Sequence, residues 1–287
     1  MNEERVALVT GGSKGIGFAI AQRLAKRKIE RLVLVARNEQ DLEAAMYKIE
    51  KEYPKTKVDI VPADLAKPEA YSVIYKHLKH YGKLDILVNN AGDFKQLPTI
   101  GRESPDHVTD DVVNLFKINA IPPAVFEHVL MPLMLASKHP LQLDVLSSAA
   151  LQIFSGNNPY GPTKAAHERI SLQTVADSCG RICTYRVYPS NVDTRLVAHF
   201  TGPKLTPEMV AEKAVDMMLD DTATDLYIKM GHKGLVTASF QLLYSKYLFE
   251  DRIGDMCLDG LKLVSDHREL IQRHFEPAID EAKNRKH

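Results

Sequence analysis

The chain has 287 residues, of which 45% are hydrophobic and 26% charged, and its formal net charge at pH 7 is zero. This balance is ordinary for a soluble protein with one large core, and a neutral chain has no long-range field to attract nucleic acid or an anionic membrane. Three cysteines form no paired framework, which indicates a reducing compartment. With a first strand expected by Val6 and no run of about 18 apolar residues, we predict neither a secretion signal nor a transmembrane segment, and hence a cytoplasmic protein.

Apolar runs alternate with helix-like segments as far as residue 230. The pattern predicts strands over residues 6–9, 31–36, 58–61, 84–88, 141–146, 181–188 and 225–230, and helices over residues 18–28, 41–45, 70–80, 106–119 and 160–177. Pro122 and Pro123 must bend or break the helix that precedes them. Strands that alternate with helices predict an α/β domain over residues 1–230, with a parallel sheet covered on both faces and ligands bound beyond the carboxyl ends of the strands.

Residues 231–287 depart from this alternation. Their pattern predicts helices over residues 235–249, 255–264 and 267–283, with an apolar face in the first of them. We expect a helical extension packed on the same domain or on a partner subunit. A substrate lid and a membrane-surface helix are the alternatives.

A glycine-rich turn joins the first predicted strand to the first helix. Gly11 permits a tight turn, Gly15 and Gly17 allow the backbone and the helix to approach closely, and the free N–H groups of the helix attract a pyrophosphate. Strand, turn and helix together favour a nucleotide site over a purely steric cluster of glycines. The predicted nucleotide-binding residues of this turn are Gly11, Ser13, Lys14, Gly15, Ile16 and Gly17.

The residue that follows the second strand indicates which nucleotide binds. Arg37 stands 20 positions after Gly17, where an NAD site would place an acid to hold the ribose 2′-hydroxyl. A guanidinium instead suits a 2′-phosphate, and Lys14 offers a second positive charge, although each could be a solvated surface cation. Glu39 is better placed in the first turn of the next helix. We therefore predict NADPH rather than NADH.

Tyr160 and Lys164 are four residues apart at the start of a predicted helix, so they share a face. A tyrosine has a pKa of about 10, and lowering that value by about three units takes roughly 4 kcal/mol. An adjacent ammonium and the positive ring of an oxidised nicotinamide could supply it, which would make the phenol an acid/base near neutral pH. Taken alone, the pair could also be an amphipathic helix with an extended lysine.

Several motifs together resemble the short-chain dehydrogenase/reductase family over about residues 5–230. They are the glycine turn, Asn89-Asn90-Ala91-Gly92, Asn119, a serine after the fifth strand, Tyr160-x3-Lys164 and Pro189-x4-Thr194. The resemblance implies a Rossmann-type doubly wound sheet of about seven strands and a hydride-transferring oxidoreductase. It also implies that Tyr160 is the acid/base, that Lys164 binds the nicotinamide ribose and lowers the Tyr160 pKa, and that Asn119 holds a water in a proton relay.

The resemblance further assigns residues around the nucleotide. It implies that Asp64 and Leu65 flank the adenine, that Asn90, Ala91 and Gly92 line the cleft, and that Val192 and Thr194, with Pro189, meet the carboxamide. Two features depart from the family pattern. Pro162 is tolerable only in the first turn of its helix, and Ser190 replaces the usual glycine.

Ser147 and Ser148 both stand at the end of the fifth strand, and only one hydroxyl can face a substrate carbonyl. The family spacing of 13 positions before the tyrosine favours Ser147, whereas a double-serine pattern would favour Ser148.

We therefore expect an NADPH-dependent reductase of ketones or aldehydes, with a small-molecule substrate and no metal. A 3-oxoacyl-thioester reductase is the alternative enzyme, although no basic cluster for a carrier is evident, and a non-catalytic NADP-binding sensor or scaffold is the alternative of another class. Members of the family that the chain resembles form dimers and tetramers, which implies a homo-oligomer here.

Overall fold

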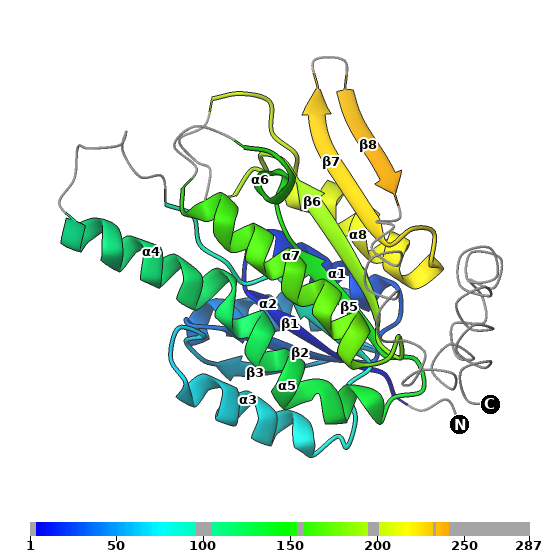
Figure 1. Ribbon diagram of the computed structural model, residues 1–287. Coiled ribbons are helices and arrows are strands. Elements are labelled where there is room, and N and C mark those ends of the chain that lie inside the picture. The colour runs from blue at the N-terminus through cyan, green and yellow to red at the C-terminus, as the bar shows by residue number, and fades with distance from the viewer. Residues whose placement is uncertain (1–3, 96–104, 154–157, 195–200, 232–233, 241–287) are drawn as a thin grey trace, which may run out of the picture.

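The described strands of the computed structural model form one eight-stranded sheet in the order β3-β2-β1-β4-β5-β6-β7-β8. The structure describes residues 4–95, 105–153, 158–194, 201–231 and 234–240 (Figure 1). The strands are β1 Val6–Thr10, β2 Arg31–Ala36, β3 Lys57–Pro62, β4 Ile86–Asn89, β5 Leu141–Val145, β6 Cys183–Pro189, β7 Asp225–Gly231 and β8 Gly234–Phe240. The first seven pair in parallel, which confirms the predicted doubly wound sheet of Rossmann type.

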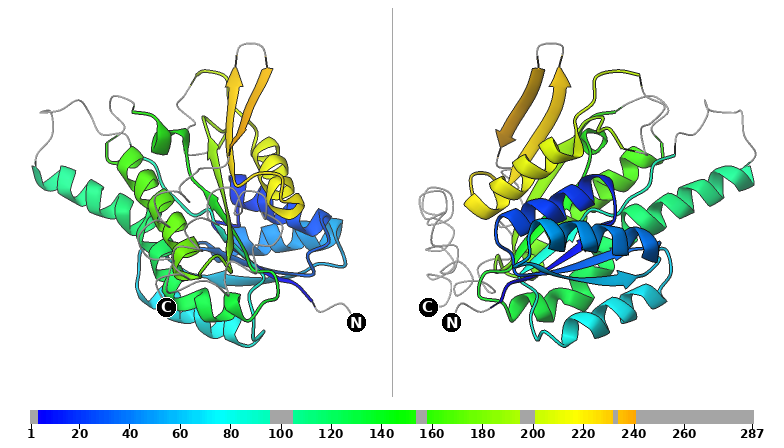
Figure 2. Two further views of the ribbon diagram at one scale, coloured as in Figure 1. Left: turned by 45° about the vertical axis from the view of Figure 1, so that its right-hand side comes forward. Right: turned by 180° about the vertical axis from the view of Figure 1, so that it is seen from behind.

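Helices cover both faces of this sheet (Figure 2). One layer holds α1 Gly15–Lys26, α2 Glu39–Glu52 and α8 Pro207–Asp220. The other holds α3 Glu69–Lys79, α4 Pro105–Asn119, α5 Ile121–Leu135 and α7 Tyr160–Asp177. A short helix, α6 Ser148–Leu151, follows β5 directly.

The two layers explain why the strands read as continuous apolar runs rather than as alternating ones. In β1, Ala7 and Val9 pack into the core on the α1 side, whereas Val6 and Leu8 pack into the core on the α3 side. All four side chains are buried, because successive residues of a strand point to opposite faces and both faces are covered.

The predicted break after Asn119 is confirmed. Helix α4 ends there, and α5 begins at Ile121 with Pro122 and Pro123 in its first turn, where a missing N–H costs no helical bond. Helix α5 itself was not predicted, because it is apolar nearly all round and shows no helical period. By length and composition the stretch Asp106–Leu135 could cross a membrane, but half of its most apolar window is buried inside the protein.

The prediction of a helix over residues 235–249 was wrong for its first part. Residues Gly234–Phe240 form β8, which pairs antiparallel with β7 from Asp225↔Phe240 to Gly231↔Gly234. The segment contains the β-branched Val236 and Thr237, which favour a strand, and the predicted apolar face was drawn mainly from residues beyond it. The remaining predicted helices lie in residues 241–287, outside the described part of the chain.

Candidate active site

The glycine turn after β1 has the backbone that its sequence predicts. Gly11 and Gly15 have φ angles of +65° and +56°, which side chains other than glycine rarely adopt. A Cβ placed on Gly17 would lie 2.3 Å from the carbonyl oxygen of Gly11 and 2.4 Å from Nδ2 of Asn90. Only glycine therefore lets the start of α1 press against both the turn and the end of β4.

One side chain ties the ends of β1 and β4 together. The Thr10 hydroxyl accepts hydrogen bonds from the backbone N–H groups of Asn90 (2.9 Å) and Ala91 (3.0 Å), and it donates to the Val88 carbonyl (3.1 Å). In return, the Asn90 amide donates to the Thr10 carbonyl at 2.8 Å. The loops that follow these two strands are thereby fixed as facing walls.

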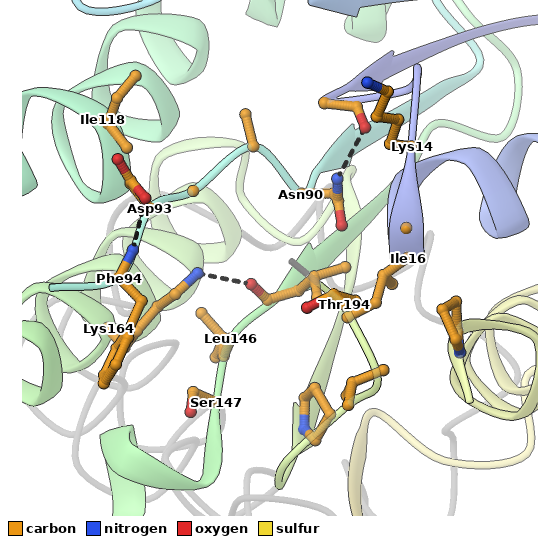
Figure 3. Close-up of a pocket in the computed structure, with 18 of the residues that line it drawn as sticks. Lys14, Ile16, Asn90, Asp93, Phe94, Ile118, Leu146, Ser147, Lys164 and Thr194 are labelled. Carbon is orange, nitrogen blue, oxygen red and sulfur yellow. Dashed lines mark hydrogen bonds between the residues drawn. The ribbon is translucent and has the colours of Figure 1, made fainter. Parts of the chain in front are cut away.

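A cavity of about 1220 Å³ opens between these walls, at the carboxyl ends of the parallel strands. It exceeds the usual volume of a small-ligand pocket, roughly 300–1,000 Å³, and so has room for a dinucleotide and a small substrate. The predicted residues that line it are Gly11, Ser13, Lys14, Gly15, Ile16, Arg37, Leu65, Asn90, Ala91, Gly92, Ser147, Ser148, Tyr160, Lys164, Pro189, Val192 and Thr194. Lys14 and Ile16 lie across the cavity from Ser147 and Lys164 (Figure 3).

Three predicted residues stand behind the cavity wall rather than in it. Gly17 is packed under the turn, and the Asp64 carboxylate accepts the backbone N–H of Ala66 at 3.1 Å. The Asn119 side chain is fully buried, accepts the N–H of Asp93 at 2.8 Å, and donates to both the Asp93 carbonyl and the Thr163 hydroxyl at 2.9 Å. Asn119 thus joins the loop after β4 to α7, and its predicted water relay stays a prediction.

Tyr160 is the first residue of α7, with Pro162 in the first turn, as the sequence predicts. The Thr163 hydroxyl donates to the Tyr160 carbonyl at 2.7 Å and fixes that turn. Ser147 caps the short helix α6, where its hydroxyl accepts the N–H of Ala149 at 3.2 Å. It lies near the Tyr160 hydroxyl in the same cavity and acts to lower the pKa of that phenol.

Burial dominates the electrostatics of the tyrosine–lysine pair. Burial raises the pKa of the Tyr160 phenol, while the nearby Ser147 acts to lower it. Burial also lowers the pKa of the Lys164 ammonium to about 8, against the negative charge of Asp144. Lys164 donates from Nζ to the Val145 carbonyl at 3.0 Å. The expected acidification of Tyr160 is thus opposed by desolvation, which sequence reasoning left out.

The two predicted cations at the far end of the cavity differ in their surroundings. Lys14 precedes the first residue of α1, its side chain is 66% exposed, and it forms an ion pair with Asp41 at 2.7 Å. Arg37 is exposed, lines the cavity and makes no ion pair with any residue the structure describes. Asn38 caps α2 by accepting the N–H of Asp41 at 2.8 Å, and Glu39 begins that helix as predicted.

Sequence reasoning missed an aromatic wall beside the tyrosine. The rings of Phe94 and Tyr160 meet edge to face, with centroids 4.9 Å apart and planes at 84°. Phe94 follows the Asn-Asn-Ala-Gly segment by two residues, and an aromatic residue just after such a turn is the signal that could have found it. Asp41 was missed as well, because its ion pair with Lys14 joins two separate elements.

The segment over residues 196–206 is described only in part. Residues 195–200 lie outside the described chain, whereas Leu205 is fully buried and forms a bridge with Val192. Thr206 caps α8, and Pro203 and Pro207 line the cavity. The described end of this segment is therefore fixed to the cavity wall.

Comparison with known proteins supports the motif pattern. A sequence model of the short chain dehydrogenase family matches residues 5–203. The chain is 30% identical over 196 residues to hydroxysteroid dehydrogenase-like protein 1 of Gallus gallus, with 68% of this chain but only 57% of that protein covered. It is 28% identical over 246 residues to very-long-chain 3-oxoacyl-CoA reductase-B of Danio rerio, with 84% of this chain and 77% of that protein covered.

Solved structures share the fold. A short-chain dehydrogenase from Sphingobium yanoikuyae in complex with NADPH gives a TM-score of 0.69 at 22% identity, over 78% of this chain and 87% of that one. The L-sorbose reductase of Gluconobacter frateurii, complexed with NADPH and L-sorbose, gives 0.66 at 25% identity, over 75% and 90%. With its matched sequence model, its parallel sheet and its cleft, the chain belongs to the short-chain dehydrogenase/reductase family of oxidoreductases.

Proposed function

We propose that the protein is an NADPH-dependent carbonyl reductase, which reduces a ketone or an aldehyde to an alcohol and can run in reverse. The observation that carries the proposal is the meeting of Ser147, Tyr160 and Lys164 at one end of a cleft whose other end presents Arg37. A proton donor, a polarising hydroxyl and a fixed cation are the groups that hydride addition to a carbonyl needs.

The residues of the cleft fit NADP(H). The positive φ angles of Gly11 and Gly15 allow the tight turn that leads into α1, and the N-terminus of this helix is where a pyrophosphate would bind. A Cβ on Gly92 would lie 3.4 Å from Nζ of Lys164, so glycine keeps this part of the cleft open. Arg37 would hold the 2′-phosphate, and Lys164 the nicotinamide ribose. Two structural neighbours are complexes with NADPH, which supports the same cofactor here.

When bound, NADP(H) supplies the hydride, and the protein handles the proton. The Tyr160 hydroxyl, near Ser147 in the cleft, gives its proton to the carbonyl oxygen as negative charge develops there. Ser147 polarises the same oxygen, and the Lys164 ammonium stabilises the phenolate that remains. Because burial raises the pKa of Tyr160, the phenol stays protonated at neutral pH, which is the form that reduction requires.

The test is NADPH consumption by the purified protein against a panel of ketones and aldehydes. We expect Tyr160→Phe to lose turnover by about 10³-fold or more, or about 4 kcal/mol in the barrier, because the proton donor is gone. NADPH affinity should change by less than about threefold. Tyr47→Phe, at a tyrosine 64% exposed on α2, is the matched control. A Tyr160→Phe protein that turns over at the wild-type rate would refute the assignment.

A 3-oxoacyl-thioester reductase is the second candidate. The Danio rerio relative that matches over 84% of this chain is a very-long-chain 3-oxoacyl-CoA reductase, and the group it reduces is itself a ketone. A 3-oxoacyl-CoA series in the same assay distinguishes the two: a kcat/KM that rises with acyl length supports the thioester substrate. NADPH binding without turnover on any carbonyl would instead support a sensor or scaffold.

Three further expectations belong to this proposal: a small-molecule carbonyl or alcohol substrate, a cytoplasmic location and a homo-oligomer. Sedimentation of the purified protein at several concentrations tests the last of these. A monomer at every concentration would contradict it.

A further inference from the structure

A buried polar cluster lies directly behind Lys164, between β5 and α7. At its centre is Asp144, whose side chain is fully buried. Its Oδ1 accepts from Nδ2 of Asn89 at 2.9 Å and lies 3.0 Å from Nε2 of His167, and its Oδ2 accepts from Nε2 of Gln142 at 2.9 Å. These bonds hold the carboxylate as an anion, and together with His167 they keep the pKa of Asp144 below its ordinary value despite burial.

The charge of Asp144 is not balanced by its hydrogen-bond partners. Asn89 and Gln142 are neutral, and burial lowers the pKa of His167, although Asp144 opposes that shift, so the imidazole donates as a neutral ring. On α5, burial raises the pKa of the Glu127 carboxyl to about 7, and an acid brings no positive charge in either protonation state.

Two cations remain near the carboxylate, and one of them is already paired. On β6, Arg186 forms a two-pronged ion pair with Asp225, at 2.7 and 2.9 Å. Among the described residues, this leaves the Lys164 ammonium as the countercharge of Asp144.

Two contacts link the carboxylate of Asp144 to the ammonium of Lys164. Lys164 and His167 are three residues apart on α7, so they lie on one face of the helix. Nζ of Lys164 donates to the carbonyl of Val145, the residue after Asp144 on β5, at 3.0 Å. The strand that carries the anion therefore also holds the ammonium.

We propose that Asp144 is a positioning residue of the reductase, which acts with His167 to hold the Lys164 ammonium charged and in place in the cleft beside Tyr160. This inference rests on the function proposed above, in which Lys164 stabilises the phenolate of Tyr160. Asp144 touches neither substrate nor nucleotide; it acts only through Lys164. The consequence concerns pH: burial lowers the Lys164 pKa to about 8 even though the charge of Asp144 acts to raise it, so without Asp144 the pKa of the amine would be lower still.

The direct test is the titration of Lys164 in the free protein. With ¹³C,¹⁵N-labelled lysine, the Nζ–Cε signal that disappears in Lys164→Arg is followed against pH. We expect its midpoint to fall by about one pH unit or more in Asp144→Asn, which removes the charge but keeps the shape. His167→Gln keeps a donor toward Asp144 and should leave the midpoint nearly unchanged. An unchanged midpoint in Asp144→Asn would overturn the proposal.

Asp85→Asn is the matched control, since Asp85 is also a buried acid, at the opposite end of the sheet, where it accepts from the Val6 N–H and the Ser137 hydroxyl. It should leave the Lys164 midpoint in place; an equal fall in both variants would show a general loss of structure and would count against Asp144.

If Asp144→Asn does not fold, the double variant Asp144→Leu/His167→Leu replaces the pair by apolar residues of similar volume, which buried sites often tolerate. The same fall in the midpoint is expected, and its absence would be decisive against the proposal.

The titration needs no turnover, so it separates the two proposals. In an active enzyme, the high-pH limb of kcat/KM should move down with the midpoint. If no carbonyl compound in the panel supports NADPH oxidation by the wild-type protein, the proposed function fails. The shift of the Lys164 midpoint in Asp144→Asn still decides whether Asp144 holds the charge of Lys164.

Discussion

The two halves of the sheet prepare the cleft in different ways. Around β1 and β4 the cleft is shaped by backbone: glycines at positive φ, a helix N-terminus and a threonine that ties two strand ends. Around β5 and β6 it presents the buried Lys164, and further buried ionisable side chains lie outside its lining: Asp144, His167 and Arg186. The first half depends on close packing of the backbone, whereas the second depends on ionisable side chains that must be in the right protonation state. Substitutions in the first half should therefore mainly reduce stability, and substitutions in the second half should mainly reduce turnover.

The largest expected effect is in the charged half. Lys164→Met removes the cation while keeping a chain of similar length, and we expect kcat/KM to fall by about 10³-fold, or about 4 kcal/mol. Stopped-flow or steady-state NADPH oxidation measures it. Lys48→Met, on α2 outside the main cavity, is the control. A variant with more than a tenth of wild-type activity would contradict the role of Lys164.

In the backbone-shaped half, Gly17→Ala should damage fit rather than chemistry. Its Cβ would lie 2.3 Å from the Gly11 carbonyl oxygen, so the turn or α1 must move, at a cost of about 1–3 kcal/mol in the free energy of unfolding. Denaturant unfolding measures the loss. Gly82→Ala, where nothing lies within 4 Å of the added Cβ but φ is +71°, separates backbone strain from the clash. Equal losses at both positions would argue against the close packing of α1.

Next comes the choice of nucleotide. Arg37→Asp should reduce the NADPH/NADH ratio of kcat/KM by about 10–100-fold, since a charge-assisted hydrogen bond contributes about 1.5–3 kcal/mol. Paired assays with both nucleotides measure the ratio. An unchanged ratio would remove Arg37 from the 2′-phosphate site.

Lys14→Gln should have a smaller effect on the same ratio. Its side chain is exposed and already paired with Asp41, and exposed ion pairs contribute about 0.2–1 kcal/mol, so a change of only a few-fold is expected. The same paired assays apply. If Lys14→Gln matched Arg37→Asp, the two cations would share the phosphate equally, contrary to their surroundings in the structure.

The smallest effect in neutral solution, but a diagnostic one, is the pH profile of reduction. Tyr160 must be protonated and Lys164 charged. Because the pKa of Tyr160 is raised and that of Lys164 is lowered to about 8, the lysine limits the reaction first as pH increases. Reduction should decline above about pH 8. A profile that is flat through pH 9 would show that the lysine stays charged there.

Local patterns were sufficient to predict most of the parallel sheet and the start of α7. The glycine turn, the two prolines after Asn119 and the position of Tyr160 are features of short segments, and short segments carry their own conformational preferences. Helix α5 escaped because its residues are apolar on every side, and β8 was assigned to the wrong class because a short apolar segment fits either period.

The site was less predictable where it depends on contacts between distant segments. The carboxylate of Asp144 behind Lys164 leaves no trace in the spacing of residues, and the place of Phe94 just after a turn does not show that its ring meets Tyr160. The direction of the Tyr160 pKa depends on how deeply the phenol is buried, which sequence does not report. Asn119, by contrast, was found by its motif, but its side chain proved to be bonded to Asp93 and Thr163.

The antiparallel strand β8 runs back along β7. Because Phe240 pairs with Asp225, at the amino end of β7, β8 carries the backbone from the carboxyl ends of the parallel strands, where the cleft opens, back toward their amino ends. With a rise of about 3.3 Å per residue, seven residues of strand span roughly 20 Å. A spectroscopic probe attached at residue 240 would therefore lie toward the end of the strands away from the nucleotide, and it would not contact the bound ligand.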